Sequence, residues 1–306
     1  MAERILARIA LVSARVAHDL DLDQPPLVEA LRRCGAEVQI ADWDDESVQW
    51  GAFDLAILRS PWDYSLRYDE FLAWAERAAS QTTLLNPLSL VRWNTDKHYL
   101  LELERAGVPI IPSQAIEPGE DVAAALDRFL LAHREEAHGE GEVVVKPAIG
   151  AGSRDVQRHD RTNRDSISQH VQRLLDARRS VLLQPFLKHV EQNGESALIF
   201  FAGGYSHSIR KGPLLQRGVS SSQSLFAAED ISARIAMPDE LDVAERALTA
   251  IPLGAPLYGR VDLIRDESGA PRVLELELAE PSLFLNYAPG SAARLADAIL
   301  AACSRL

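Results

Sequence analysis

Cysteine and basic side chains are scarce in this 306-residue chain, and each shortage argues against certain classes of protein. Its two cysteines, Cys34 and Cys303, cannot supply a disulfide framework, and neither stands in a CxxC or Cys/His spacing typical of a metal site. We therefore expect a cytoplasmic protein. The chain has 32 Lys and Arg against 45 Asp and Glu, a net charge of −13. Because nucleic-acid binding relies on basic side chains that neutralise phosphates, we expect no nucleic-acid partner.

Long apolar runs are missing as well. The apolar stretch at residues 5–12 is interrupted by Arg8 and is too short for a membrane span or for the core of a signal peptide. We therefore expect no membrane partner. The 47% of hydrophobic residues is instead enough for two or three compact units. A homodimer is compatible with this composition, on the base rate of symmetric dimers alone.

Short apolar runs alternate with helical patterns over the first ninety residues. This alternation is typical of an α/β fold in which helices cover a parallel sheet, so we assign residues 1–93 to an N-terminal α/β domain. A second unit is expected to begin near residue 94, and the remainder of the chain mixes strands and helices without internal repeats. Residues 212–224 contain Gly and Ser without apolar periodicity, which predicts a mobile loop.

A β-hairpin is predicted near the C-terminus, where residues 260–264 and 273–278 flank turn-forming residues. A turn centred between positions 268 and 269 places Asp262 opposite Glu275 and Arg260 opposite Glu277. Because side chains alternate along a strand, these four project from one face. The other face is expected to hold four apolar residues, Val261, Leu263, Leu274 and Leu276.

Three carboxylates on one strand face require a compensating cation. Their oxygens are ligands that Mg²⁺ or Mn²⁺ prefers, so Asp262, Glu275 and Glu277 are candidate metal ligands. An equally well supported alternative is a solvated face on which Arg260 and Glu277 form an ordinary cross-strand salt bridge.

Lys146 ends a predicted strand and precedes a small-residue loop that includes Gly150, Gly152 and Ser153. Such a loop allows backbone N–H groups to approach phosphate oxygens, but taken alone the pattern favours a plain hairpin turn. The loop matches neither the P-loop nor the dinucleotide-binding pattern. Further along, the segment Gln184-Pro185-Phe186-Leu187 ends a strand, where an amide and an aromatic ring could meet a purine or simply enter a turn.

Taken in order, these segments resemble the ATP-grasp superfamily, in the branch of glutathione synthetase and D-alanine:D-alanine ligase. The resemblance covers about residues 94–286, and its strongest element is Gly-Arg-Val-Asp-Leu followed by Leu-Glu-Leu-Glu. It implies an N-terminal α/β domain at residues 1–93 and two lobes that clamp ATP, a central lobe at residues 94–185 with a glycine-rich lid and a C-terminal lobe at residues 186–306 with the metal site. It further implies an ATP- and Mg²⁺-dependent ligase that activates a substrate carboxylate as an acyl phosphate for attack by a nitrogen nucleophile.

The resemblance also implies a role for each matching residue. Lys97 and Lys146 would hold the phosphates beneath the loop of Gly150, Gly152 and Ser153. The remaining implied roles are adenine binding by Gln184, Phe186 and Leu187, ribose binding by Glu191, γ-phosphate binding by Lys211, metal binding by Asp262, Glu275 and Glu277, and stabilisation of the phosphoryl group and oxyanion by Arg260. Two positions depart from the usual pattern, because many relatives have Asn at Glu277 and an acidic residue at Gln184.

A small amino-acid-like substrate is expected next to the nucleotide. Arg59 and Trp62 follow a predicted strand in the N-terminal domain, where they could bind a small carboxylate or instead form a packed turn. Ser282 and Asn286 are further candidates, with helix capping as the alternative. Residues 59–64 and 275–284 are similar to the ATP-grasp cyclo-ligases of D-cycloserine biosynthesis, which cyclise O-ureido-D-serine. An intermolecular amino-acid or peptide ligase and a non-catalytic ATP-binding module are the alternative functions.

Overall fold

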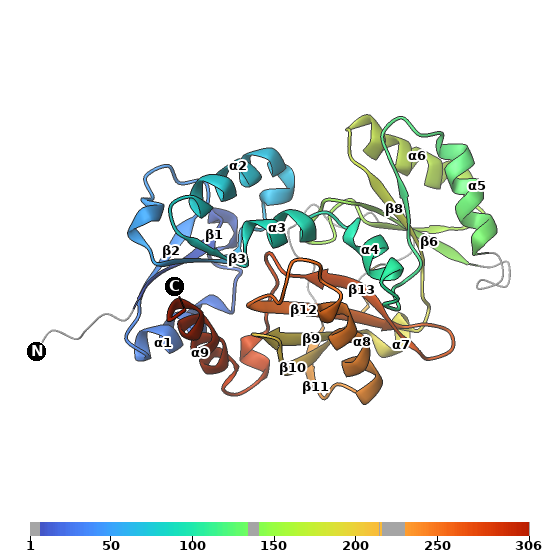
Figure 1. The fold of residues 1–306 in the computed structure, drawn as a ribbon. Helices are drawn as coiled ribbons and strands as arrows, with labels where there is room; N and C mark the ends of the chain where they lie inside the picture. Colours follow the sequence, from blue (N-terminus) through green and yellow to red (C-terminus); the bar gives the residue numbers. More distant parts are fainter. Residues whose placement is uncertain (1–6, 134–140, 214, 216–229, 306) are drawn as a thin grey trace, which may run out of the picture.

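Three β-sheets organise the computed structural model, which describes residues 7–133, 141–213, 215 and 230–305 (Figure 1). The sheets come from successive parts of the chain, and they confirm the expected α/β fold, with a parallel N-terminal sheet followed by lobes that mix strands and helices. Most of the predicted loop at 212–224, namely residues 214 and 216–224, lies outside the described residues. None of the described helices is long and apolar enough to cross a membrane.

The N-terminal sheet is parallel and has the strand order β2-β1-β3-β4. Its strands are β1 (Arg8–Ser13), β2 (Glu37–Asp42), β3 (Leu55–Ser60) and β4 (Thr83–Leu85). In β1, Ile9 and Leu11 pack into one apolar core, whereas Ala10 and Val12 pack into another. Helices cover both faces, which explains why the strand is apolar without alternation.

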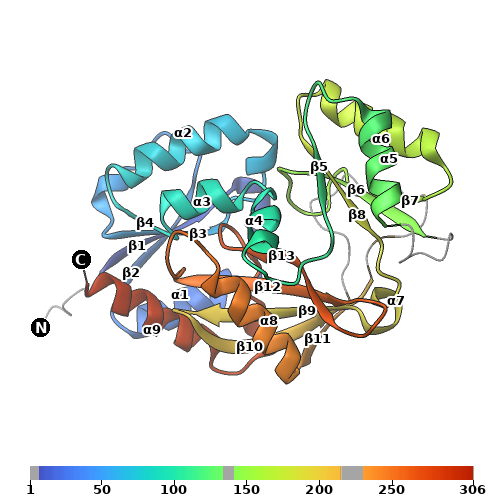
Figure 2. The same ribbon diagram turned by 45° about the vertical axis from the view of Figure 1, so that its right-hand side comes forward.

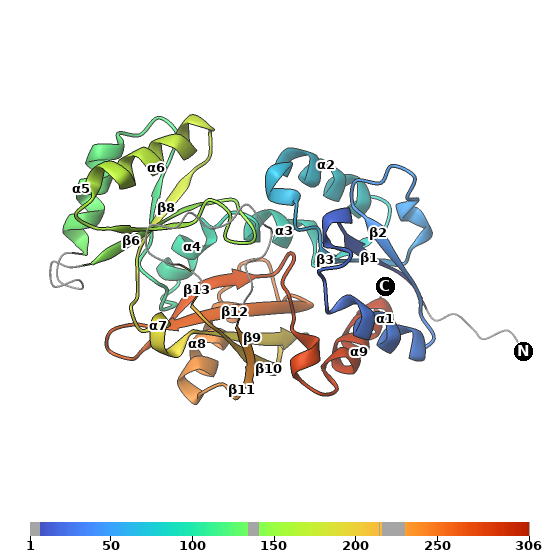
Figure 3. The same cartoon turned by 180° about the vertical axis from the view of Figure 1, so that it is seen from behind.

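Four helices form the two layers that cover this sheet. Helix α1 (Gln24–Arg33) and the C-terminal helix α9 (Ser291–Cys303) cover one face, and α2 (Tyr68–Ala79) and α3 (Leu88–Asn94) cover the other. Figure 3 shows α9 beside α1, so the end of the chain returns to the N-terminal sheet.

The central sheet is antiparallel, with the order β5-β8-β6-β7. Its strands are β5 (Gln114–Ile116), β6 (Glu142–Pro147), β7 (Gln157–Asp160) and β8 (Val181–Pro185), and one face carries α5 (Val122–Ala132) and α6 (Arg164–Asp176). Val143 and Val145 pack against these helices. The alternation of β6 therefore turns Val144 and Lys146 to the opposite face, where both line a cavity.

The C-terminal sheet is antiparallel, with the order β11-β10-β9-β12-β13, and lies below the central lobe in Figure 2. Its strands are β9 (Glu195–Phe201), β10 (Gly204–Lys211), β11 (Ile231–Arg234), β12 (Tyr258–Arg265) and β13 (Pro271–Glu277). Helices α4 (Tyr99–Arg105) and α8 (Pro238–Thr249) pack on its outer face. The short helix α7 (Val190–Asn193) precedes β9, and the described 3₁₀ turns are Arg15–Ala17, Trp50–Ala52, Tyr64–Leu66 and Leu285–Tyr287.

Buried polar side chains join the N-terminal sheet to the C-terminal one. The Asp23 carboxylate accepts hydrogen bonds from the backbone N–H groups of Leu283, Phe284 and Leu285 at 2.5, 3.1 and 2.7 Å. The Asn86 amide donates to the carbonyl oxygens of Tyr258 and Leu278, at 2.9 and 2.7 Å. Because a buried polar group is costly to leave unpaired, these contacts fix the two sheets relative to each other.

Candidate active site

A cavity of about 680 Å³ lies between the central and C-terminal sheets and extends to the N-terminal domain. Its size is in the range usual for small-molecule sites. The predicted site residues that line it are Trp62, Lys97, Lys146, Gly150, Gly152, Ser153, Gln184, Phe186, Leu187, Lys211, Arg260, Asp262, Glu275, Glu277, Ser282 and Asn286. Segments that are far apart in the sequence therefore meet at one place.

The acidic hairpin of β12 and β13 has the predicted register at its site end. Asp262 pairs with Glu275, and Arg260 pairs with Glu277. All four line the cavity, which confirms that they share a face.

Beyond Asp262 a β-bulge shifts the register of the hairpin by one residue, so that Leu263 pairs with Val273. The prediction that Leu274 faces the core is therefore wrong, because the extra residue of a bulge leaves the alternation of its strand. Leu274 lies instead at the cavity, next to Ile264.

Basic and acidic side chains form ion pairs across the cavity. Lys146 Nζ lies 3.2 Å from Glu275 Oε1, and Lys97 Nζ lies 3.9 Å from the same oxygen. Burial alone would raise the pKa of Glu275, but Lys97 and Lys146 together lower it. Burial lowers the pKa of Lys146, against the attraction of Glu275. The central lobe thus presents cations to the carboxylates of the C-terminal sheet.

Arg260 and Lys211 hold the remaining carboxylates. Arg260 Nε lies 2.8 Å from Asp262 Oδ1, and the same guanidinium pairs with Glu277. Lys211 Nζ lies 2.8 Å from Asp262 Oδ2. Each predicted metal ligand therefore has a cationic partner, and within the described ranges no group of three His, Cys, Asp or Glu side chains stands ready to hold a metal ion. The alternative salt bridge between Arg260 and Glu277 is present, but on a largely buried face rather than a solvated one.

Glu195 is a cavity residue that the sequence analysis missed. It pairs with Lys211 across β9 and β10, and its Oε2 lies 2.7 Å from Lys211 Nζ. Burial raises the pKa of the Glu195 carboxyl, although Lys211 opposes the shift. The hairpin of β9 and β10 was predictable, but a register shift between Tyr205 and His207 sets which residue faces Lys211.

The small-residue loop after β6 lies over the basic side chains. Lys97 Nζ donates a hydrogen bond to the Gly150 carbonyl oxygen at 2.9 Å. Gly152 and Ser153 have left-handed backbones, with φ of 62° and 57°. At the end of the loop, Asp155 pairs with Arg179 at 2.5 Å. The loop is thus held at both ends and lines the cavity between them.

The end of the cavity beside β8 is apolar. Phe186 and Leu187 pack there with Ile111, Val190, Ile264 and Leu274. The Gln184 amide is buried and donates to Ser113 Oγ at 2.8 Å. Behind Phe186, the Arg158 guanidinium lies 3.5 Å from the centre of the ring. A flat, largely apolar ring system matches these surroundings.

The N-terminal domain closes the other end of the cavity with Trp62, Tyr64 and Asp21. Trp62 Nε1 donates to the Glu280 carbonyl oxygen at 3.0 Å, and the Tyr64 hydroxyl is hydrogen-bonded to the Glu280 carboxylate. Asp21 is only 4% exposed, and its Oδ2 has no hydrogen-bond partner among the described residues. Sequence reasoning missed Tyr64, Glu280 and Asp21 as site residues, because a tyrosine or carboxylate in a loop gives no periodic signal.

Ser282 and Asn286 also lie at this end. The Ser282 carbonyl oxygen accepts a hydrogen bond from Arg260 Nη1 at 2.9 Å, and Asn286 Nδ2 donates to the Leu22 carbonyl oxygen at 2.9 Å. Neither side chain caps α9, whose N-cap residue is Gly290.

Two predicted site residues do not line the cavity. Arg59 is fully buried, donates to the Pro281 carbonyl oxygen at 3.0 Å and lies 3.7 Å from Asp23, so it supports the wall rather than contacting a ligand. The Glu191 side chain is 51% exposed and pairs with Arg158 at 2.7 Å. Both predictions relied on position along the chain, whereas side-chain direction decides which residues reach the cavity.

Comparison with known proteins agrees with this geometry. Residues 9–86 match the family described as the N-terminal domain of D-cycloserine synthetase DcsG. The chain is 43% identical over 296 residues to the cycloserine biosynthesis protein DcsG of Streptomyces lavendulae, covering 95% of this chain and 97% of that protein. The chain belongs to the DcsG family of ATP-grasp ligases.

Solved structures share the fold of this chain. A crystal structure of D-cycloserine synthetase DcsG matches with a TM-score of 0.89 at 41% identity, covering 97% of this chain and 99% of that one. A D-alanine–D-alanine ligase from Bacillus anthracis complexed with ATP matches with a TM-score of 0.66 at 16% identity, covering 98% of both chains. The predicted resemblance to ATP-grasp ligases is confirmed.

Proposed function

We propose that this ATP-dependent carbon–nitrogen ligase closes O-ureido-D-serine to D-cycloserine through an acyl phosphate. The observation that carries the proposal is the pairing of Lys146 on the central lobe with Glu275 on the C-terminal sheet, across a cavity that also reaches the N-terminal domain. The 43% identity to a cycloserine biosynthesis protein supports the choice of substrate.

The triphosphate lies between the two lobes in this proposal. Lys97, Lys146 and the loop of Gly150, Gly152 and Ser153 contact its phosphates. Lys211 and Arg260 face the γ-phosphoryl group, and Gln184, Phe186 and Leu187 surround the adenine ring. This proposal gives Glu191 no ribose contact, because Glu191 is not among the residues that line the cavity and its side chain pairs with Arg158.

The donor set fits a divalent cation. Asp262, Glu275 and Glu277 present carboxylate oxygens on one strand face, and such oxygens suit Mg²⁺ and also Mn²⁺. Bound there, the ion supplies positive charge that offsets the charge of the phosphates. Nucleotide phosphates would draw the lysines and Arg260 away from the carboxylates, which then become available to the ion. We therefore expect the nucleotide and the cation to bind cooperatively.

The chemistry follows from the poor reactivity of a carboxylate. Transfer of the γ-phosphoryl group to the substrate carboxylate creates an acyl phosphate, whose phosphate is a good leaving group. Lys211, Lys146 and Arg260 stabilise the negative charge that develops during the transfer. The ureido nitrogen bonded to oxygen then attacks the acyl carbon, because only that nitrogen closes a five-membered ring.

Mass spectrometry of the products from O-ureido-D-serine, ATP and Mg²⁺ tests the proposal. We expect a five-membered cyclic product together with ADP and phosphate, formed only when both substrates are present. Unchanged O-ureido-D-serine under conditions in which ATP binds would refute the substrate. Phosphate release with a two-component amide product from other amino acids would favour an intermolecular ligase.

A further inference from the structure

Glu280 is a carboxylate at the substrate end of the cavity that neither the metal nor the phosphates need. It lies beyond β13, and two aromatic residues of the N-terminal domain hold it in place. The Tyr64 hydroxyl is hydrogen-bonded to its carboxylate, and Trp62 Nε1 donates to its backbone oxygen at 3.0 Å. Tyr64 is 2% exposed and packs against Phe71, with ring centroids 5.2 Å apart, so its position is fixed by the core.

Ring closure requires a proton acceptor. The attacking ureido nitrogen carries one hydrogen, and it becomes cationic as the bond to the acyl carbon forms unless that proton leaves. The cations of the site, such as Lys97 and Arg260, are poor acceptors, and in the function proposed above Glu275 and Asp262 are ligands of the divalent cation. A carboxylate that binds neither the cation nor the phosphates, and lies at the substrate end, is suited to the task.

We propose that Glu280 accepts the proton of the ureido nitrogen during ring closure, and that Tyr64 positions it. This inference rests on the function proposed above. In the step, the nitrogen–carbon bond forms, the bond between the acyl carbon and the phosphate oxygen breaks, phosphate leaves with the electron pair, and the nitrogen-bound proton passes to Glu280. The ring product retains the carbamoyl group on its nitrogen. One water molecule then cleaves the bond between that nitrogen and the carbamoyl carbon, the carbamoyl group leaves as carbon dioxide and ammonia, and Glu280 releases its proton to solvent.

The surroundings of Glu280 favour this role. Burial raises the pKa of its carboxyl, while the Tyr64 hydrogen bond and the charges of Lys97 and Arg260 lower it. Glu275 and the phenol of Tyr258 are the other titratable groups that interact with it. A raised pKa makes the carboxylate a stronger base at neutral pH, and the nearby cations keep it ionised.

The two chemical steps can be measured separately in a Glu280→Gln variant. Hydroxylamine traps an acyl phosphate as a hydroxamate, which reports the first step, and the cyclic product reports the second. We expect hydroxamate and substrate-dependent ADP to form at near wild-type rates, while ring closure falls about 10²- to 10⁴-fold. Tyr64→Phe keeps the ring but loses the hydroxyl, and we expect a smaller loss confined to ring closure.

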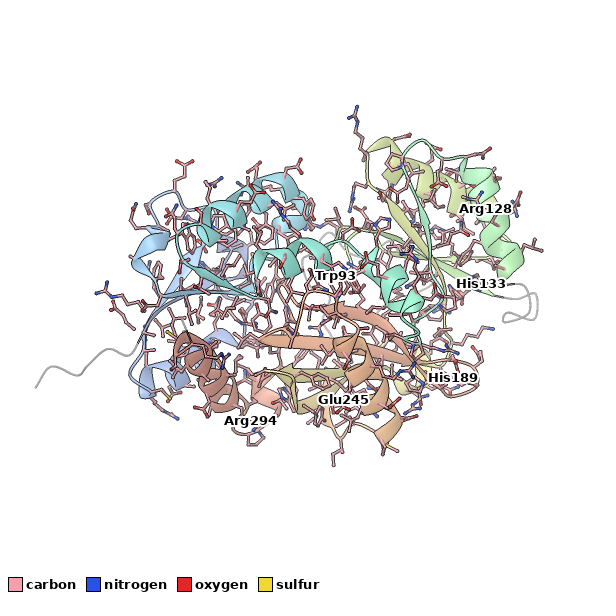
Figure 4. All side chains as sticks on the ribbon, in the orientation of Figure 1. Trp93, Arg128, His133, His189, Glu245 and Arg294 are labelled. Atoms are coloured by element: carbon pink, nitrogen blue, oxygen red, sulfur yellow. The ribbon has the colours of Figure 1, made fainter. Side chains whose placement is uncertain are left out.

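Glu245→Gln is the matched control, because Glu245 is exposed on α8 on the outer side of the C-terminal sheet (Figure 4). It should close the ring at the wild-type rate. The wild-type ring-closure rate should fall as pH drops through the pKa of Glu280, and this fall should be absent in Glu280→Gln. The hydroxamate rate, measured over the same pH series, separates Glu280 from groups that act in phosphoryl transfer.

Three results would overturn the inference while leaving the proposed function intact. They are wild-type ring closure in Glu280→Gln, equal loss of hydroxamate and ring product in a folded variant, and an unchanged pH dependence. If the wild-type protein forms neither hydroxamate nor ring product from O-ureido-D-serine, the proposed function itself fails. Unfolding temperatures of the variants, measured alongside, identify any that do not fold, and Tyr64→Phe then serves in place of Glu280→Gln.

Discussion

Lys146 and Glu275 are 129 residues apart in the sequence, yet Lys146 Nζ lies 3.2 Å from Glu275 Oε1. The lysine belongs to the central sheet and the glutamate to the C-terminal one. Both side chains are turned into the cavity by their strands, so a cation of the central lobe meets a carboxylate of the C-terminal one. This pair joins the phosphate-binding and metal-binding halves of the site.

Removing charge from the acidic face should stop turnover without unfolding the protein. We expect Glu275→Gln and Asp262→Asn to fold normally, because each amide fits the space of the carboxylate. Both should lose nearly all substrate-dependent phosphate release, since the cation loses a charged ligand. Assays over a Mg²⁺ titration, with thermal unfolding as the fold control, measure this. Wild-type Mg²⁺-dependent activity in either variant would remove the metal assignment.

Asp21 should recognise the ammonium group of the substrate. Its buried Oδ2 lacks a hydrogen-bond partner among the described residues, and a charged hydrogen bond contributes about 1.5 to 3 kcal/mol. Asp21→Asn should therefore raise the KM for O-ureido-D-serine roughly 10- to 100-fold and leave the KM for ATP unchanged. Asp19→Asn, at an exposed position, is the control. Equal effects of both substitutions would count against a specific contact.

Gly194 determines the path of the chain beside Lys211. Its φ is +70°, and a Cβ atom would lie 2.2 Å from the Lys211 carbonyl oxygen. Gly194→Ala should lower the free energy of unfolding by about 2 kcal/mol or more and reduce turnover by displacing Lys211. Gly254→Ala has a similar φ of +90° but open space around it, so it measures the backbone cost alone. If both variants lose the same stability in urea unfolding, the clash is unimportant.

A buried histidine pair should make the central lobe sensitive to acid. His159 Nε2 lies 3.0 Å from His170 Nδ1, and burial lowers the pKa of His170 from 6.5 to about 4. Between these values the unfolded chain binds a proton that the folded chain does not, so stability falls as pH drops from 6.5 towards 4. The loss is about 2 to 3 kcal/mol when the pH reaches 4.

His170→Asn tests the assignment of this pH dependence. The asparagine amide can occupy the place of Nδ1 and keep a hydrogen bond to His159, but it does not titrate. Urea unfolding of the variant should depend less on pH between 4 and 6.5 than that of the wild type. The same slope in both proteins would show that other groups set the acid stability.

Local patterns predicted much of the site because the relevant contacts are close in sequence or lie along one strand. The register of Arg260 with Glu277 follows from the turn position and the period of two. The same reasoning was wrong for Leu274, since a bulge adds one residue without a sequence signal. The pairing of Lys211 with Asp262 was also outside its reach, because Lys211 belongs to a different strand, β10.

Long-range packing decided the residues that sequence reasoning misjudged. Arg59 follows a strand edge where ligands often bind, but its side chain turns into the interior towards Asp23 and Pro281. No sequence pattern distinguishes Glu280, whose proposed role as proton acceptor follows from its contacts with Tyr64 and Trp62. Such roles depend on contacts between segments about 220 residues apart, as with Trp62 and Glu280, which are 218 positions apart.

The carboxylate of Asp23 accepts hydrogen bonds from the backbone N–H groups of Leu283, Phe284 and Leu285, and α9 packs beside α1. The N-terminal domain and the C-terminal lobe are consequently held together as a single unit. Nucleotide exchange must then come from displacement of the central sheet, which carries Lys146 and faces that unit across the cavity through ion pairs such as Lys146 with Glu275. Product departure then breaks the contacts of Lys146 with the phosphates and lets it return to Glu275, so the speed of release should respond to salt concentration.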